Sequence, residues 1–156
     1  MTFQIHVKET EMNAGPAAAL VERNAEEVKA RLSTLWIVVM FALLTADVLS
    51  AYIPGTTEEM AEFAGEIPIP QLMLVAAILN AIPIVMIYLS RVLRPSANRW
   101  ANIVAAVLTI VYVLGAGSAY PHYLFLAAVE VVSLLAIIWY AWRWPVQEKT
   151  VAQLAM

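Results

Sequence analysis

Two carboxyl groups stand in stretches of sequence that are otherwise apolar, and they are the residues best placed to do chemistry. Asp47 lies in the apolar stretch 35–53 and Glu130 in the stretch 123–144. At ~1.5 Å per helical residue, both lie ~9 to 13 Å below the same surface of a membrane. A charge in hydrocarbon costs about 3 kcal/mol or more, so such acids usually face the protein interior, a partner or water. We expect a buried carboxylate pair at this depth.

Other polar side chains share the depth of this pair. Helical spacing brings Asn80 from the stretch 71–89, and Thr109 with Tyr112 from the stretch 100–119, to the same half of the membrane. His122 stands at the mouth, where it is a pH gate, a lone haem ligand or simply an interfacial residue. The predicted site for ligand binding or proton relay is therefore Asp47, Asn80, Thr109, Tyr112, Glu130 and His122.

Two readings of this polar layer remain open. Two close carboxyl groups in a low dielectric do not both ionise easily, so the pair suits a proton relay, a bound cation or the head of an amphiphilic ligand. The alternative is a protonated network that only holds helices together, in which each polar contact contributes ~0.6 to 2 kcal/mol.

Four apolar stretches, at 35–53, 71–89, 100–119 and 123–144, come close to the ~20 residues that cross ~30 Å of hydrocarbon as a helix. All nine basic residues lie on one side of this pattern, and residues 54–70 and 116–122 contain none. They are Lys8, Arg23, Lys29, Arg31, Arg91, Arg94, Arg99, Arg143 and Lys149. Because basic loops stay in the cytoplasm, both termini are predicted to be cytoplasmic, with the plasma membrane as the expected location.

The segment LSRVLRPSANRWANI between the second and third stretches is the most basic part of the chain. Its polar residues suit contact with anionic lipid headgroups, although determination of topology alone also explains them. The predicted contact set is Arg91, Arg94, Arg99, Asn98 and Asn102.

Helix signals predict an all-α fold: a four-transmembrane-helix bundle with a cytoplasmic N-terminal amphipathic helix and a short outer interfacial helix. Residues 1–31 form a cytoplasmic tail and helix, irregular to residue 15 and helical from Pro16; residues 32–146 form the four-span membrane domain, and 147–156 a cytoplasmic tail. Thr56 with Glu59 fits a capping box for the outer helix, which would lie over the bundle as a lid. Pro83 is expected to kink the second span.

Composition excludes several classes of function. The chain has no cysteine, so disulfide exchange and thiolate-bound metals are excluded. The net charge of -3 and the absence of a basic face argue against nucleic-acid binding. We expect no metal site, and the sequence names no cofactor.

Several short patterns together resemble a known group of proteins. They are ADVLS in the first span, MIYLSRVL at the end of the second, NRWANI at the start of the third, and a glutamate followed by AWRWP in the fourth. Over about residues 32–146 the chain resembles an uncharacterised family of small bacterial four-helix integral membrane proteins, loosely similar to DoxX-like proteins. The resemblance implies a four-helix bundle in a bacterial or archaeal membrane and no particular activity.

Three functions remain open from the sequence. The first is a protein that binds a small amphiphilic ligand or relays protons through the carboxylate pair. The second is a non-catalytic accessory subunit of a larger membrane complex, and the third is a membrane enzyme acting on a lipophilic substrate. The expected partners are the lipid bilayer and either further copies of the chain or a larger assembly.

Overall fold

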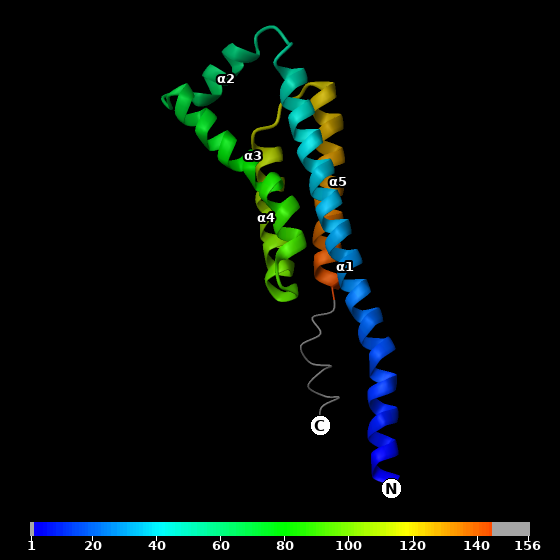
Figure 1. Cartoon of the computed structure of the whole chain (residues 1–156). Coiled ribbons are helices and arrows are strands. Elements are labelled where there is room, and N and C mark those ends of the chain that lie inside the picture. Colours follow the sequence, from blue (N-terminus) through cyan, green and yellow to red (C-terminus); the bar gives the residue numbers. More distant parts are fainter. Residues whose placement is uncertain (1, 145–156) are drawn as a thin grey trace.

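The computed structural model describes the backbone of residues 2–144 and the side chains of residues 19–144. The regular secondary structure of this part of the chain is all helical, with no strand (Figure 1). The helices are α1 (Thr2–Ser50), α2 (Thr56–Ala64), α3 (Ile69–Val92), α4 (Pro95–Gly115) and α5 (Pro121–Arg143). The predicted tail 147–156, with Lys149, lies outside the described residues.

Prolines set several of the helix boundaries. Pro95 and Pro121 are the first residues of α4 and α5, and Pro70 stands in the first turn of α3. Proline suits these positions because its fixed φ fits the first helical turn and the N–H that it lacks would have had no partner there. The predicted limits of the last three spans therefore lie within about five residues of the ends of α3, α4 and α5.

Helix α1 is longer than the sequence suggested. The irregular structure predicted for residues 1–15 is wrong over residues 2–15, because the helix is continuous from Thr2 to Ser50. The segment from Thr2 to Ala14 contains neither proline nor glycine, and Pro16 removes only one backbone hydrogen bond from a helix that continues on both sides of it. The amphipathic character predicted for this segment stays a prediction.

Four of the helices are long and apolar enough to cross a membrane. They pack in a closed order, in which α1 contacts α3 and α5, and α4 contacts the same two helices. The core between them contains Trp36, Leu43, Met86, Val113 and Leu134. Many large apolar side chains point outward from the same helices, as expected for surfaces that face lipid.

The two ends of the bundle differ in construction. One, which we call the α2 end, carries the segment 51–68 with α2 and the α4–α5 connection 116–120. The other, the hairpin end, carries the short α3–α4 connection. At the α2 end, the first half of α3 leans away from α4 and α5 (Figure 1). Helix α2 spans the gap between the start of α3 and the end of α1. Pro83 lies inside α3 and accounts for the change of direction.

Helix α2 begins differently from the prediction. Its N-cap is Gly55, in the left-handed conformation with φ 92°, and no side chain caps the helix. Thr56 instead donates its hydroxyl back to the carbonyl oxygens of Ser50 and Ile53, at 3.0 and 2.7 Å. The predicted capping box is therefore wrong, because Thr56 satisfies the free end of α1 rather than the start of α2.

Candidate functional site

A cavity of about 820 Å³ opens at the α2 end, in the space that the leaning half of α3 leaves. Its walls come from α1, α2, α3, α4, the α4–α5 connection and the start of α5. Most of this wall is apolar, with Met60 and Phe63 from α2 and Leu72, Met73 and Val75 from α3. The volume is within the range of small-molecule sites, about 300 to 1,000 Å³.

Three of the predicted site residues line this cavity together. Asp47 comes from α1, Asn80 from α3 and Tyr112 from α4. The amide nitrogen of Asn80 donates to the hydroxyl oxygen of Tyr112 at 3.3 Å. The structure thus brings polar groups from three helices to one apolar-walled space.

Glu130 lies outside the cavity, in the bundle interior. Its side chain is only 2 % exposed, whereas Asp47 is exposed and lines the cavity. The expectation of two buried carboxyl groups is therefore wrong for Asp47, because α3 leans away from the position where it would have covered this residue. The described contacts include no hydrogen bond between the two carboxyl groups.

The remaining two predicted residues stand apart from the cavity wall. Thr109 is buried, and its hydroxyl donates to the carbonyl oxygen of Ala105 in its own helix at 2.9 Å. His122 is half-buried, with Nε2 3.1 Å from the hydroxyl oxygen of Ser50. Its ring stacks on that of Tyr120, with centroids 6.0 Å apart. His122 therefore supports the rim rather than facing the cavity.

A hydrogen bond ties α2 to the α4–α5 connection across the cavity rim. The hydroxyl of Tyr120 donates to Oε1 of Glu59 at 2.7 Å, and both residues line the cavity. Because the bond to Glu59 favours the protonated hydroxyl, it raises the pKa of Tyr120 above its usual value. Tyr120 therefore keeps the donated proton at neutral pH and loses it when alkaline conditions ionise the hydroxyl.

The α4–α5 connection is fixed by a second tyrosine. The hydroxyl of Tyr123 donates to the carbonyl oxygen of Val113 at 2.7 Å. A Cβ atom on Gly117 would lie 3.2 Å from both the Tyr123 ring and that carbonyl oxygen, so a larger residue would have to displace these groups by a few tenths of an ångström. Beside it, the hydroxyl of Ser118 is buried in the cavity wall without a partner among the described residues.

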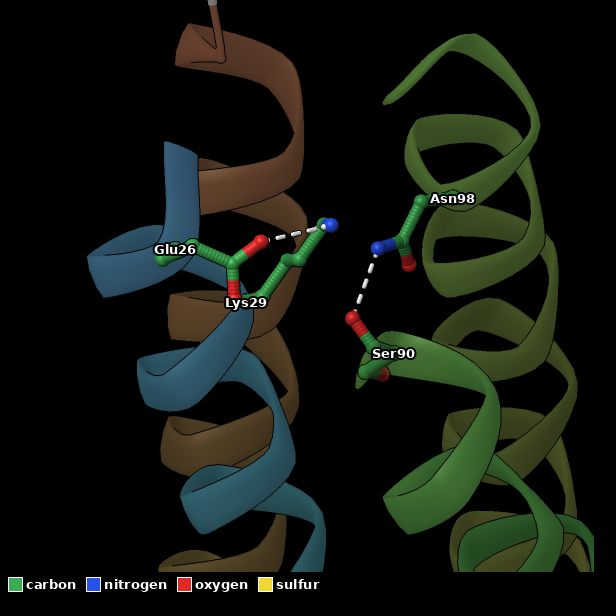
Figure 2. Close-up of polar contacts among 4 residues, drawn as sticks. All are labelled: Glu26, Lys29, Ser90 and Asn98. Carbon is green, nitrogen blue, oxygen red and sulfur yellow. Dashed lines mark hydrogen bonds and ion pairs between the residues drawn. The ribbon is translucent and has the colours of Figure 1, made fainter. Parts of the chain in front are cut away.

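The hairpin end contains a second polar cluster, which is fully buried. Oδ1 of Asn102 accepts from the indole N–H of Trp36 at 2.7 Å and from the hydroxyl of Ser90 at 3.1 Å. Its amide nitrogen donates to Oδ1 and to the carbonyl oxygen of Asn98, at 2.6 and 2.9 Å. The amide of Asn98 donates in turn to the carbonyl oxygen of Ser90 at 2.7 Å (Figure 2). This cluster joins α1, α3 and α4.

These bonds change the predicted headgroup set. Asn98 and Asn102 are 0 % exposed, so both point into the protein and neither reaches a lipid headgroup. The sequence placed them beside Arg91, Arg94 and Arg99 because they are close along the chain, but their helical positions face the core. Arg91 and Arg94 are exposed, and the guanidinium of Arg99 lies over the ring of Trp142 at 5.0 Å.

Helix α1 adds a charge to this end of the bundle. Lys29 reaches from α1 toward the side where Ser90 and Asn98 lie, and its Nζ pairs with Oε1 of Glu26 at 2.8 Å (Figure 2). The Lys29 side chain is 17 % exposed and that of Glu26 62 %.

The described part of the chain holds no group of three side chains that would bind a metal ion.

Sequence reasoning missed Glu59, Tyr120 and Tyr123 as residues of the cavity. The sequence pattern placed Glu59 in a capping box, and no pattern indicated a role for the two tyrosines. The available signal was the prediction that the outer helix lies over the bundle as a lid, since Met60 and Phe63 of this helix line the cavity. The contact between Glu59 and Tyr120 joins residues 61 positions apart, and no local pattern indicates it.

Comparison with known proteins gives one family and no individual relative. No curated protein and no solved structure matches the chain. The family model that matches covers residues 20–152 and is described as a family of unknown function. The match is consistent with the expected lack of a known activity and does not show a likeness to DoxX-like proteins. Since it covers most of the sequence, this chain belongs to the family of unknown function DUF6326.

Proposed function

We propose that this protein binds a small amphiphilic molecule in the cavity at the α2 end. The observation that carries the proposal is the arrangement of the wall. Apolar side chains of α2 and α3 form most of it, and Asp47, Asn80 and Tyr112 supply polar groups from three helices. An apolar pocket with a few convergent polar groups is the usual form of a small-molecule site.

The proposed setting is the plasma membrane, with both termini and the hairpin end in the cytoplasm. Charge asymmetry supports this orientation, because the described basic side chains lie before α1 enters its apolar part, around the α3–α4 connection and at the end of α5. In this orientation the cavity belongs to the outer half of the membrane, where a molecule enters from lipid or from the outer solution.

The exposed arginines of the hairpin end then reach the cytoplasmic headgroups. Arg91 and Arg94 are exposed, and neither has a carboxylate within 4.0 Å among the described residues. We include Arg99 in this contact, since its guanidinium lies at the same end over Trp142. Contact with anionic lipid phosphates stabilises the orientation and is separate from the cavity.

Proton relay is the second candidate for the cavity, and one observation favours it. Glu130 is almost fully buried in the bundle interior, and a second carboxyl group, that of Asp47, lines the cavity. Acidic side chains within membrane-spanning helices are candidates for proton transfer, and this bundle contains two of them. The accessory-subunit and enzyme hypotheses have no comparable observation in their favour.

The test is to fill the cavity without altering its charges. Ala76 lines the cavity on α3, and we expect Ala76→Trp to displace any molecule held there. Native mass spectrometry of the protein, extracted gently from its own membrane, should show a bound small molecule in the wild type and none in Ala76→Trp.

The matched control is Ile78→Trp. Ile78 lies two residues further along α3 and is 59 % exposed, outside the cavity. This variant adds a similar side chain to the lipid-facing surface, so it should retain the molecule. Retention of the same molecule by Ala76→Trp, or its absence from all three proteins, contradicts the proposal.

A further inference from the structure

The charges around the cavity are of one sign. Asp47 and Glu59 line it, and no lysine, arginine or histidine does so among the residues that the structure describes. We propose that the molecule bound there is a lipophilic cation, an organic amine or quaternary ammonium group attached to an apolar body. This inference rests on the proposed function and specifies the chemical class of its ligand.

Hydrogen bonding within the wall points to the same class. The hydroxyl protons of Thr56, Tyr120 and Tyr123 are already donated to protein oxygens. The carboxyl group of Asp47 and the second oxygen of Glu59 have no donor among the described residues. Three hydroxyl donors of the wall are thus already used, whereas its two carboxyl groups keep free acceptor oxygens, which suits a ligand that is positively charged or donates hydrogen bonds. The hydroxyl of Ser118, buried in the wall without a partner among the described residues, remains as a donor.

The backbone supplies another acceptor. Pro83 has no N–H, so the carbonyl oxygen of Leu79 loses its usual partner in α3. Leu79 lines the cavity next to Asn80. An unpaired carbonyl in an apolar environment is costly, and a cationic or N–H-bearing head would offset that cost.

Aromatic rings complete a suitable environment for a cation. Tyr112, Tyr120, Tyr123 and Phe63 all line the cavity. Ring faces attract cations by about 0.5 to 2 kcal/mol, and cages of such rings are a known means of binding quaternary ammonium groups. An anionic head would not be attracted by these ring faces and would be repelled by ionised carboxyl groups of Asp47 and Glu59.

The effect of ligand charge on binding can be tested with two hydrophobic ions of nearly the same size and shape. Tetraphenylphosphonium is positive and tetraphenylborate negative. Binding of each would be measured by equilibrium dialysis against the full chain in nanodiscs of zwitterionic lipid, after subtraction of the uptake by empty nanodiscs. We expect the protein to bind the phosphonium at least about tenfold more tightly, a factor equal to about 1.4 kcal/mol.

Charge-removing variants locate the effect. Asp47→Asn and Glu59→Gln should each weaken phosphonium binding about tenfold. Glu62→Gln is the control, because it makes the same change on α2 at a residue outside the cavity. Glu59 lies in α2, outside the long apolar helices, so its variant remains informative if Asp47→Asn fails to insert.

The cavity-filling variant distinguishes the two proposals. Binding of the borate as tight as that of the phosphonium, with both abolished by Ala76→Trp, overturns the cation inference and leaves the binding of an amphiphile standing. No binding of either ion by the wild type, or binding that Ala76→Trp leaves unchanged, overturns both. Both proposals are supported if the wild type binds the phosphonium selectively, Ala76→Trp abolishes this binding, and Asp47→Asn and Glu59→Gln weaken it while Glu62→Gln does not.

Discussion

Asn102 uses its complete hydrogen-bonding capacity inside the protein. An amide side chain has two acceptor positions and two donors, and here Trp36, Ser90 and both oxygens of Asn98 occupy them. A polar group that is fully satisfied in this way stabilises the packing of α1, α3 and α4 and requires no ligand. At the residue scale, the hairpin end is therefore structural, in contrast with the unpaired acceptors of the cavity.

Replacement of this one amide should be costly. Asn102→Ala leaves the indole N–H of Trp36 and the hydroxyl of Ser90 without their acceptor in a buried site, so we expect a loss of about 2 to 3 kcal/mol in the free energy of unfolding. Denaturation of the detergent-solubilised protein, followed by tryptophan fluorescence, would measure it.

Thr109→Val is the matched control for that measurement. Thr109 is equally buried but donates only to a carbonyl oxygen of its own helix, and we expect its loss to cost less than about 1 kcal/mol. Equal effects of the two substitutions would contradict a special role for the Asn102 cluster.

Helix α3 is the element that decides whether a cavity exists. Its second half packs in the bundle, with Pro83, Met86 and Ser90 buried, whereas none of the residues before Pro83 is buried. At the element scale, one proline separates a packed half from a leaning half, and α2 bridges the resulting space.

Pro83→Ala should let the leaning half move toward α1. Alanine at position 83 has the N–H that proline lacks and can donate it to the carbonyl oxygen of Leu79, which favours a straighter helix. Because the chain has no cysteine, spin labels at Gln71→Cys and Leu49→Cys would report the separation of α3 and α1 at the α2 end. We expect a shorter mean distance in the Pro83→Ala background. An unchanged distance would show that packing by α2, rather than the proline, holds α3 in place.

Sequence patterns predicted the long helices well because length, apolarity and proline positions are local properties. Pro95 and Pro121 mark the starts of two helices, and both behave as expected. The site was harder to predict, because the direction in which α3 leans depends on packing around Pro83. That direction decides that Asp47 is exposed and that Glu59 and Tyr120 meet, and spacing along a helix does not encode it.

At the scale of the whole molecule, orientation in the membrane is the property that most needs a direct measurement. Single cysteines at Glu62, in α2, and at Ser96, near the α3–α4 connection, stand at opposite ends of the bundle. If the basic end is cytoplasmic, a membrane-impermeant maleimide added to intact cells should label Glu62→Cys and leave Ser96→Cys unlabelled. The reverse pattern would invert the proposed topology, and labelling of both would indicate a dual orientation.

The continuity of α1 has a geometric consequence. Asp47, near the C-terminal end of α1, lines the cavity, and Ala19 lies in the N-terminal half of the same unbroken helix. At about 1.5 Å per residue, the two residues are about 42 Å apart along the helix axis. A tilt of about 5° around the Asp47 end of such a rod displaces Ala19 by about 4 Å. A small adjustment of α1 around a bound molecule would therefore move the far part of this helix, on the hairpin side, by several ångströms.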